Sequence, residues 1–144
     1  MFLNIYLRKG IVFMPTSGFV HQGLHRDIEP VSVVPVFKTD AVRQAFTDTI
    51  ARGNPPTPHY ARGSHPQPVV LKYAGVKTWA AFARGTSSWS IKKRDGSWEI
   101  VSYRTHRDGH WEEDPEQATT FPLRSTLTEV IDRMIAILQD AARK

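Results

Sequence analysis

The residues best suited to chemistry lie in one short segment, in which His106 and His110 flank Arg107, Asp108 and Gly109. Two histidines four positions apart can bind one metal ion when both project from the same face of a helix. The Asp-Gly pair between them favours a turn, and no glutamate follows the first histidine as in a zinc protease. The chain also has no cysteine to supply a thiolate ligand. We therefore expect no metal site and no cofactor.

The same two histidines, together with His59 and His65, could instead act as general acid and base on RNA. The run from Lys92 to Arg94 lies among aromatic residues, a mixture that nucleic-acid-binding proteins use for phosphate contact and base stacking. The chain has 19 Lys and Arg against 14 Asp and Glu, a net charge of +5, which permits a nucleic acid or an acidic protein as partner. A small basic RNA-binding protein or ribonuclease is therefore the alternative hypothesis.

Other catalytic patterns are absent from the sequence. It contains no phosphate-binding glycine loop and no Gly-x-Ser-x-Gly segment, and the lack of cysteine removes thiol nucleophiles as well as disulfides. No nucleophile, base and stabiliser stand at a recognisable spacing. We therefore expect a binding protein and not an enzyme. The lack of cysteine is also typical of the reducing cytoplasm, where we expect the protein to act.

An aromatic and charged surface around Trp111 is the best candidate for recognition, because Trp, Tyr and Arg dominate the affinity of protein interfaces. Trp111 is the tryptophan we expect to be exposed, since the strand pattern below places Trp89 and Trp98 in the core. The proline-rich residues 54–68 are expected to form a stiff loop without regular structure. The predicted partner-binding residues are Arg107, His110, Trp111, Glu112, Glu113, Asp114, Tyr60 and Arg62.

A β-hairpin is the clearest of the elements that must position these residues. Asp95-Gly96 supplies the positive φ angles of a tight type I′ turn between two runs rich in Trp, Ile, Val and Tyr. This turn places Lys92 opposite Glu99 and Ile91 opposite Ile100. Because strand side chains alternate between faces, one face of the hairpin is predicted to be buried. That face carries Trp89, Ile91, Trp98 and Ile100.

Two amphipathic helices are predicted outside the hairpin. From Asp40 to Arg52, apolar residues recur along one stripe, and Gly53 follows as a helix-ending residue. From Ser125 to Leu138, apolar residues recur at intervals of three and four after a Thr126 capping box. A third, shorter helix is predicted from Val76 to Arg84. We expect the two longer helices to pack on one face of a sheet.

The remaining segments complete the predicted sheet. Val31 to Phe37 is expected at a sheet edge or in an extended loop, because Pro35 cannot donate to a strand ladder. Val69 to Tyr73 is predicted as a short strand. Residues 1–14 form either an edge strand or a flexible N-terminal extension, and their apolar run is too short to span a bilayer, so we expect no membrane partner.

These elements predict one α+β domain over residues 1–144, with a mostly antiparallel sheet around a central hairpin. Two amphipathic helices and one short helix are expected to pack against it. A chain of 144 residues can bury enough surface to fold as a single domain without disulfides.

The order of the elements resembles that of the immunity proteins of bacterial contact-dependent growth inhibition systems. The similarity covers about Val36 to Leu138 and rests on Val76-Lys-Thr-Trp-Ala-Ala-Phe82, Ser90-Ile91, Asp95-Gly96, the Ile100 to Arg104 strand and Ser125 to Leu138. It implies a cytoplasmic protein without catalytic activity that binds a cognate toxin domain, often a nuclease, and neutralises it by stoichiometric occlusion. Nucleic acid is not expected as the partner. The family has no fixed binding residues, so the resemblance assigns none here.

Overall fold

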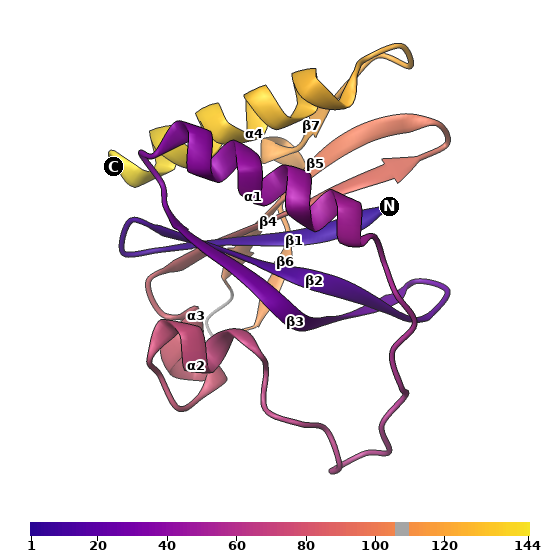
Figure 1. The fold of residues 1–144 in the computed structure, drawn as a ribbon, viewed down its shortest axis with the longest axis vertical. Helices are drawn as coiled ribbons and strands as arrows, with labels where there is room; N and C mark the ends of the chain where they lie inside the picture. Colours follow the sequence, from indigo (N-terminus) through magenta and orange to yellow (C-terminus); the bar gives the residue numbers. More distant parts are fainter. Residues whose placement is uncertain (106–109) are drawn as a thin grey trace.

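One antiparallel sheet organises the chain in the computed structural model, which describes residues 1–105 and 110–144. Within these ranges the strand order is β3-β2-β1-β4-β5-β6, and β7 pairs with β5 (Figure 1). The strands are β1 Phe2–Arg8, β2 Ile11–His21, β3 Leu24–Pro35, β4 Thr86–Arg94, β5 Ser97–Thr105, β6 Trp111–Glu113 and β7 Thr119–Thr120. The helices are α1 Thr39–Arg52, α2 Val70–Ala74, α3 Trp79–Ala83, α4 Leu127–Ala142 and the 3-10 turn η1 Pro115–Gln117.

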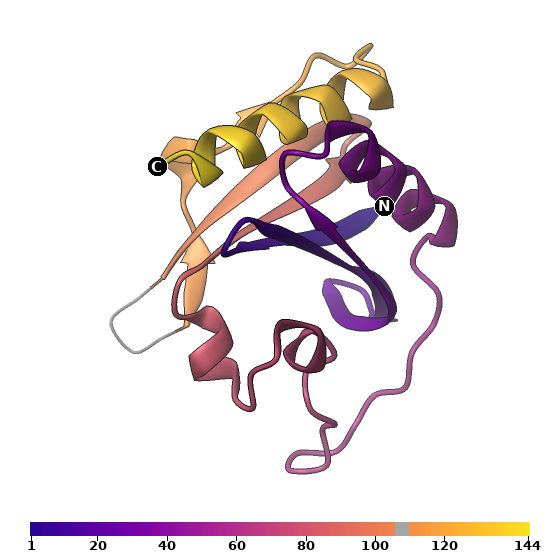
Figure 2. The same ribbon diagram turned by 60° about the vertical axis from the view of Figure 1, so that its left-hand side comes forward.

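The predicted α+β class, with a mostly antiparallel sheet, is confirmed. Helices α1 and α4 lie side by side on one face of the sheet, and the short α2 and α3 lie on the other (Figures 1 and 2). Among the described residues, no helix has the length and apolarity needed to cross a membrane.

The β4–β5 hairpin has the predicted register. Ile91 pairs with Ile100 and Lys92 with Glu99, and the turn residues Asp95 and Gly96 have φ angles of 54° and 80°. The predicted buried face is also confirmed: Trp89, Ile91 and Ile100 belong to the main core, and Trp98 is partly buried at its margin. The local turn chemistry therefore fixes which side chains of this hairpin enter the core.

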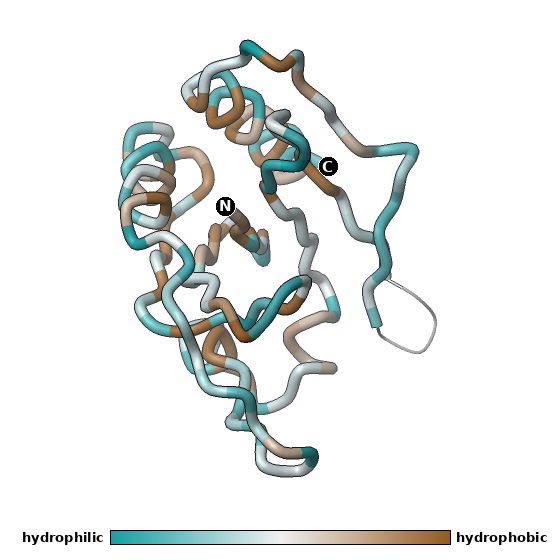
Figure 3. The backbone as a smooth tube through the Cα atoms, turned by 90° about the vertical axis from the view of Figure 1, so that its right-hand side faces the viewer, coloured by the Kyte–Doolittle hydropathy of each residue, from teal (hydrophilic) through white to brown (hydrophobic). Residues whose placement is uncertain are grey.

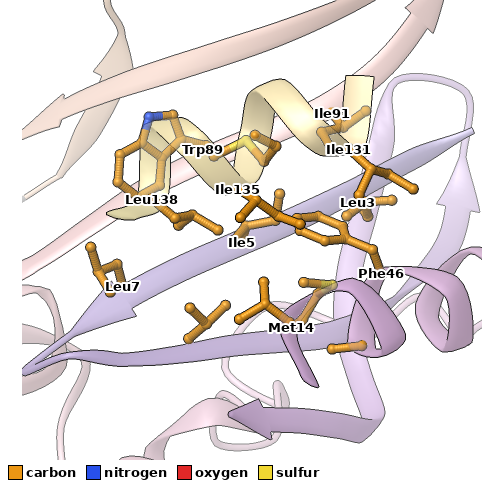
Figure 4. Close-up of a cluster of buried hydrophobic side chains, with 14 of the residues drawn as sticks. Leu3, Ile5, Leu7, Met14, Phe46, Trp89, Ile91, Ile131, Ile135 and Leu138 are labelled. Atoms are coloured by element: carbon orange, nitrogen blue, oxygen red, sulfur yellow. The ribbon is translucent and has the colours of Figure 1, made fainter. Parts of the chain in front are cut away.

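The main core fills the space between the sheet and the two longer helices. Phe46 of α1 and Leu138 of α4 are fully buried against apolar side chains of β1, β2 and β4 (Figure 4). Helix α4 begins as predicted, because the Thr126 hydroxyl accepts a hydrogen bond from the Glu129 amide at 3.2 Å. Hydrophobic and hydrophilic positions alternate along the helical turns, as expected of helices with one buried side (Figure 3).

The N-terminal residues occupy the middle of the sheet. Strand β1 pairs with β2 on one side and with β4 on the other, and Leu3, Ile5 and Leu7 are buried in the main core. The prediction of an edge strand or a flexible extension for residues 1–14 is therefore wrong. The predicted edge position of Val31 to Phe37 holds for β3, which ends the sheet and includes Val31.

The predicted strand from Val69 to Tyr73 is also wrong, because these residues form most of α2. Val70 and Leu71 are both buried, and Gly75 caps the helix with a φ of 71°. An apolar run of five residues is too short for its periodicity to separate a strand from one helical turn. The following helix is shorter than predicted and spans Trp79–Ala83, with the Thr78 hydroxyl as its cap.

Candidate functional site

The face of the sheet turned away from α1 and α4 is lined by polar and aromatic side chains, and we call it the open face. It arises from strand alternation, since Asn4 pairs with Ser90 and Tyr6 with Ser88 between the buried pairs of the core. Helices α2 and α3 cover only part of it, through an aromatic cluster (Figure 2). The open face consists of Phe2, Asn4, Tyr6, His25, Asp27, Ser88, Ser90, Lys92, Tyr103, Trp111 and Glu113.

A continuous hydrogen-bond network crosses the open face from β3 to β5. The Asp27 carboxylate accepts from the Asn4 amide at 2.9 Å and from the Tyr6 hydroxyl at 2.5 Å. The Asn4 oxygen accepts in turn from the Ser90 hydroxyl at 2.7 Å, and the Ser90 and Tyr103 hydroxyls lie 3.0 Å apart. Because each side chain holds the next, the network fixes the rotamers of these five side chains.

The electrostatics of this network follow from its burial. Burial raises the pKa of Asp27, while the hydrogen bonds from Tyr6 and Asn4 partly lower it. The pKa of Tyr6 is raised well above its usual value, first by burial and then by the Asp27 charge. Burial also raises the pKa of Tyr103. Both tyrosines therefore keep their protons at neutral pH and are held as hydrogen-bond donors.

The Asn54 side chain bridges β1 and β2 beyond the end of their ladder. The β1–β2 ladder runs only from Arg8 paired with Ile11 to Tyr6 paired with Phe13. Beyond it, the Asn54 side chain accepts from the Phe2 amide at 3.0 Å and donates to the Phe2 carbonyl at 2.7 Å and the Ser17 carbonyl at 2.8 Å. At this end of the ladder, Asp27 of β3 accepts hydrogen bonds from Asn4 and Tyr6 of β1.

The proline-rich segment of residues 54–68, which we call the strap, has no helix or named strand, as predicted. It runs from the end of α1 to α2 (Figure 1) and is tied to the sheet by two hydrogen bonds between Phe19 and residues Pro55 and Thr57, at 2.8 and 2.9 Å. The strap lies so close to Gly18 that a Cβ there would stand 2.9 Å from Thr57. A stiff, anchored strap can present side chains with little loss of entropy.

Two clefts flank the network. The first, which we call the basic cleft, has a volume of about 720 Å³ and is lined by Phe2, Leu24, His25, Lys92, Lys93, Arg94, Tyr103, Trp111 and Glu113, among others. The second, the strap cleft, has a similar volume of about 720 Å³ and is lined by Arg26, Asp27, Glu29, Tyr60, Leu71, Lys72 and Val76, among others. Asp27 lines the strap cleft while its partners Asn4 and Tyr6 line the basic cleft, so the network forms the wall between them.

Trp111 is not the exposed anchor that the sequence suggested. It is partly buried, stacks on Tyr6 with ring centroids 5.7 Å apart and meets the edge of Trp79 at 5.4 Å. Its indole nitrogen donates to the Thr105 hydroxyl at 2.7 Å. The physical reason is that β6 pairs with β5 and so brings Trp111 over the aromatic cluster of α3. It nevertheless lines the basic cleft.

Two of the acidic residues predicted beside Trp111, Glu112 and Glu113, have cationic partners. Glu112 accepts from Arg104 at 2.8 Å, and the Glu113 carboxylate lies 3.6 Å from the Lys92 ammonium. Asp114 is partly buried, and its amide donates to the Ser102 carbonyl at 2.8 Å. His110 is exposed next to this group. Arg107, like His106, lies outside the described residues.

Tyr60 and Arg62 are separated from this group. Tyr60 belongs to the strap and lines the strap cleft. The Arg26 guanidinium lies over the Tyr60 ring, 4.4 Å from the ring centroid. Arg62 is exposed farther along the strap. The described residues of the predicted site thus fall into two groups, and of their members Trp111 and Glu113 line the basic cleft and Tyr60 lines the strap cleft.

The central residues of the open face are not among the site residues predicted from the sequence. Asn4 and Tyr6 alternate with Leu3, Ile5 and Leu7, and this pattern indicates a strand with one polar face. Asp27 carries no such signal, because only the register of β3 brings it to β1. Among residues 1–105 and 110–144, no three His, Asp or Glu side chains are arranged to hold a metal ion.

Comparisons with known proteins bear on the fold. No protein-family model and no curated protein sequence matches the chain. Its structure is similar to that of the protein of unknown function NMB0488 from Neisseria meningitidis, with a TM-score of 0.63 and 12% sequence identity. The match covers 96% of this chain and 90% of the other. At this identity the similarity extends to the fold alone, over nearly the whole of both chains.

Proposed function

We propose that the protein is a cytoplasmic immunity protein that binds a cognate bacterial toxin domain and blocks it by stoichiometric occlusion, without catalysis of its own. The toxin would be the C-terminal domain of a contact-dependent inhibition protein, of nuclease type. The sequence resemblance motivates this proposal, and the open face supports it.

The observation that carries the proposal is the fixed geometry of the open face. Asp27, Asn4, Ser90 and Tyr103 are held by each other, and the two clefts beside them are walled by strands and by the anchored strap. A surface whose side chains are already ordered loses little entropy when a partner binds. A protein that inhibits by occlusion needs such an ordered surface, because it must bind its partner tightly enough to keep it inactive.

The concave shape of the face also suits a protein partner. Interfaces of stable complexes bury about 1,600 Å² in total, or about 800 Å² on each side. Two neighbouring clefts of about 720 Å³ each offer concave features over which such an area can form. A few anchoring side chains from the partner would then dominate the affinity.

The test is co-expression with the product of the gene immediately upstream. The toxin-like C-terminal domain encoded there should arrest growth when expressed alone, and this protein should restore growth and co-purify with it at equal stoichiometry. The proposal fails if that domain is harmless alone, or if it arrests growth equally in both cases and does not co-purify.

The alternative, an RNA-binding protein or ribonuclease, is favoured by one observation: Lys92, Lys93 and Arg94 line a single cleft. It predicts affinity for single-stranded RNA that falls steeply with salt. Filter binding of a labelled RNA oligonucleotide at low salt checks it, and the absence of retained RNA removes this alternative.

A further inference from the structure

We infer that the basic cleft receives an acidic segment of the partner protein, one that also inserts an apolar side chain against the tip of the β2–β3 hairpin. This inference rests on the proposed function, since it names the part of the molecule that would grip the toxin domain and the chemistry that it would grip.

The charge of the cleft defines the first half of the inference. The described lining of the cleft contains three cationic residues, Lys92, Lys93 and Arg94, and one carboxylate, that of Glu113. The Lys92 ammonium lies 3.6 Å from this carboxylate, a separation too long for a hydrogen bond. Lys92 therefore keeps donors for a second carboxylate. Lys93 and Arg94 are exposed at the rim, with the Lys93 ammonium 5.4 Å from the centre of the Trp98 ring, and their charges attract negative charge over a longer range.

The aromatic rings of the cleft favour a peptide over a nucleic acid. The His25 ring is stacked on Phe2 at 4.6 Å and is met by the edge of Phe19 at 5.7 Å. Trp111 is engaged by Tyr6 and by α3. Proteins that bind single-stranded RNA or DNA stack bases on exposed aromatic faces. In this cleft, His25 and Trp111 instead pack against other aromatic rings of the protein.

The apolar surface at the cleft's mouth is aliphatic. Leu24, at the tip of the β2–β3 hairpin, is 39% exposed and lines the cleft opposite the end of β4. An exposed leucine beside cations matches a segment that carries both an apolar side chain and carboxylates. A phosphate backbone would use the cations and leave Leu24 without a partner.

The floor of the cleft supplies neutral, fixed hydrogen-bonding groups. Tyr103 and Asn4 lie there, both held through Ser90. Such a floor orients a bound segment without adding charge. The consequence for inhibition is specific: a protein that imitated RNA would present carboxylates to a nuclease, whereas this cleft presents cations and so holds an acidic part of the toxin.

The experiment reverses the two exposed charges. Lys93→Glu with Arg94→Glu should weaken binding of the upstream-encoded toxin domain about 100-fold or more in isothermal titration calorimetry. The matched control is Arg124→Glu with Arg133→Glu, which changes the net charge equally at exposed positions beyond the cleft. The control should stay within about threefold of wild type, because distant surface charges are screened by salt. Circular dichroism verifies that both variants are folded.

A second pair of variants tests the apolar contact. Leu24→Ser should weaken the same binding about tenfold, since a single apolar anchor carries about this share of an interface's affinity. Leu123→Ser, at a leucine that is 71% exposed and does not line the cleft, should leave the affinity unchanged.

Each outcome of these binding experiments has one interpretation. If the wild-type protein does not bind the toxin domain, the proposed function is wrong. If it binds and the cleft and control variants bind equally, the function stands and the inference is overturned. If the Lys93→Glu, Arg94→Glu variant loses affinity for an RNA oligonucleotide while its toxin affinity is unchanged, the cleft serves nucleic acid and the inference is again overturned.

Discussion

The face of β1 that meets α1 and α4 carries Leu3, Ile5 and Leu7, whereas the other face of the same strand carries Asn4 and Tyr6. On the first face, stability comes from close apolar packing, which is not directional. On the second, the side chains are held by directional hydrogen bonds that are useful only when every partner is present. One strand thus separates the part of the molecule that stabilises the fold from the part that we propose as the binding surface.

The largest expected effect comes from truncating the apolar face. Phe46 is fully buried between α1 and the sheet, so Phe46→Ala should lower the free energy of unfolding by about 3–5 kcal/mol, measured by urea denaturation. Phe37→Ala is the control, because this phenylalanine is 54% exposed and its loss should cost about 0.5 kcal/mol or less. Similar costs for the two variants would contradict the assignment of the core.

A smaller loss of stability is expected where Asn54 bridges β1 and β2. Asn54→Ala removes three hydrogen bonds and leaves the Phe2 amide and two carbonyls to find other partners. We expect a loss of about 1–3 kcal/mol in the same assay. Gln44→Ala, which removes one exposed bond to Asp48, is the control and should be nearly neutral. An Asn54→Ala variant as stable as wild type would mean that these three hydrogen bonds contribute nothing to the junction of β1 and β2.

The open face should also impose a pH dependence. Because burial raises the pKa of Asp27, the native state keeps a proton that the unfolded chain has already lost over a window above the ordinary carboxyl pKa. The contribution of Asp27 to stability is therefore full below that window and declines as pH rises through the folded pKa. Asp27→Asn removes this titration, so its stability should change less than that of wild type from acidic to neutral pH.

Urea denaturation at a series of pH values measures this difference. Asp48→Asn serves as the control, since Asp48 lies on the exposed side of α1. Wild type and Asp27→Asn profiles that run parallel across the whole range would show that Asp27 does not titrate differently in the folded and unfolded states.

The elements that could be predicted from sequence are those set by local signals. Asp95-Gly96 determines the register of its own hairpin, and the spacing of apolar residues reveals α1 and α4. The pairing of strands that are distant in the sequence could not be predicted. Strand β1 is central because Phe2 to Arg8 pairs with Lys92 to Thr86, far along the chain, and no local pattern specifies that partner.

The same distinction explains the site. Glu112 and Glu113 could be proposed from their neighbours in sequence, and both are part of the charged group beside β5. Asp27 could not, because its role depends on where β3 falls relative to β1. Trp111 was misjudged for a related reason: its partners Tyr6 and Trp79 come from distant segments. Surfaces assembled from several strands are therefore harder to predict from the sequence than the helices that support them.

The smallest expected effect concerns Lys92, which lies where the two regions meet. Its side chain is only 15% exposed, while its partner Glu113 is 56% exposed and remains well solvated. Lys92→Met keeps the aliphatic stem and removes the charge, so stability should stay within about 0.5 kcal/mol of wild type. Lys92→Ala loses the stem as well and should cost somewhat more, about 1 kcal/mol. If urea denaturation instead gave the two variants equal costs of well over 0.5 kcal/mol, the ion pair that both remove, and not the packed stem, would stabilise the edge of the open face.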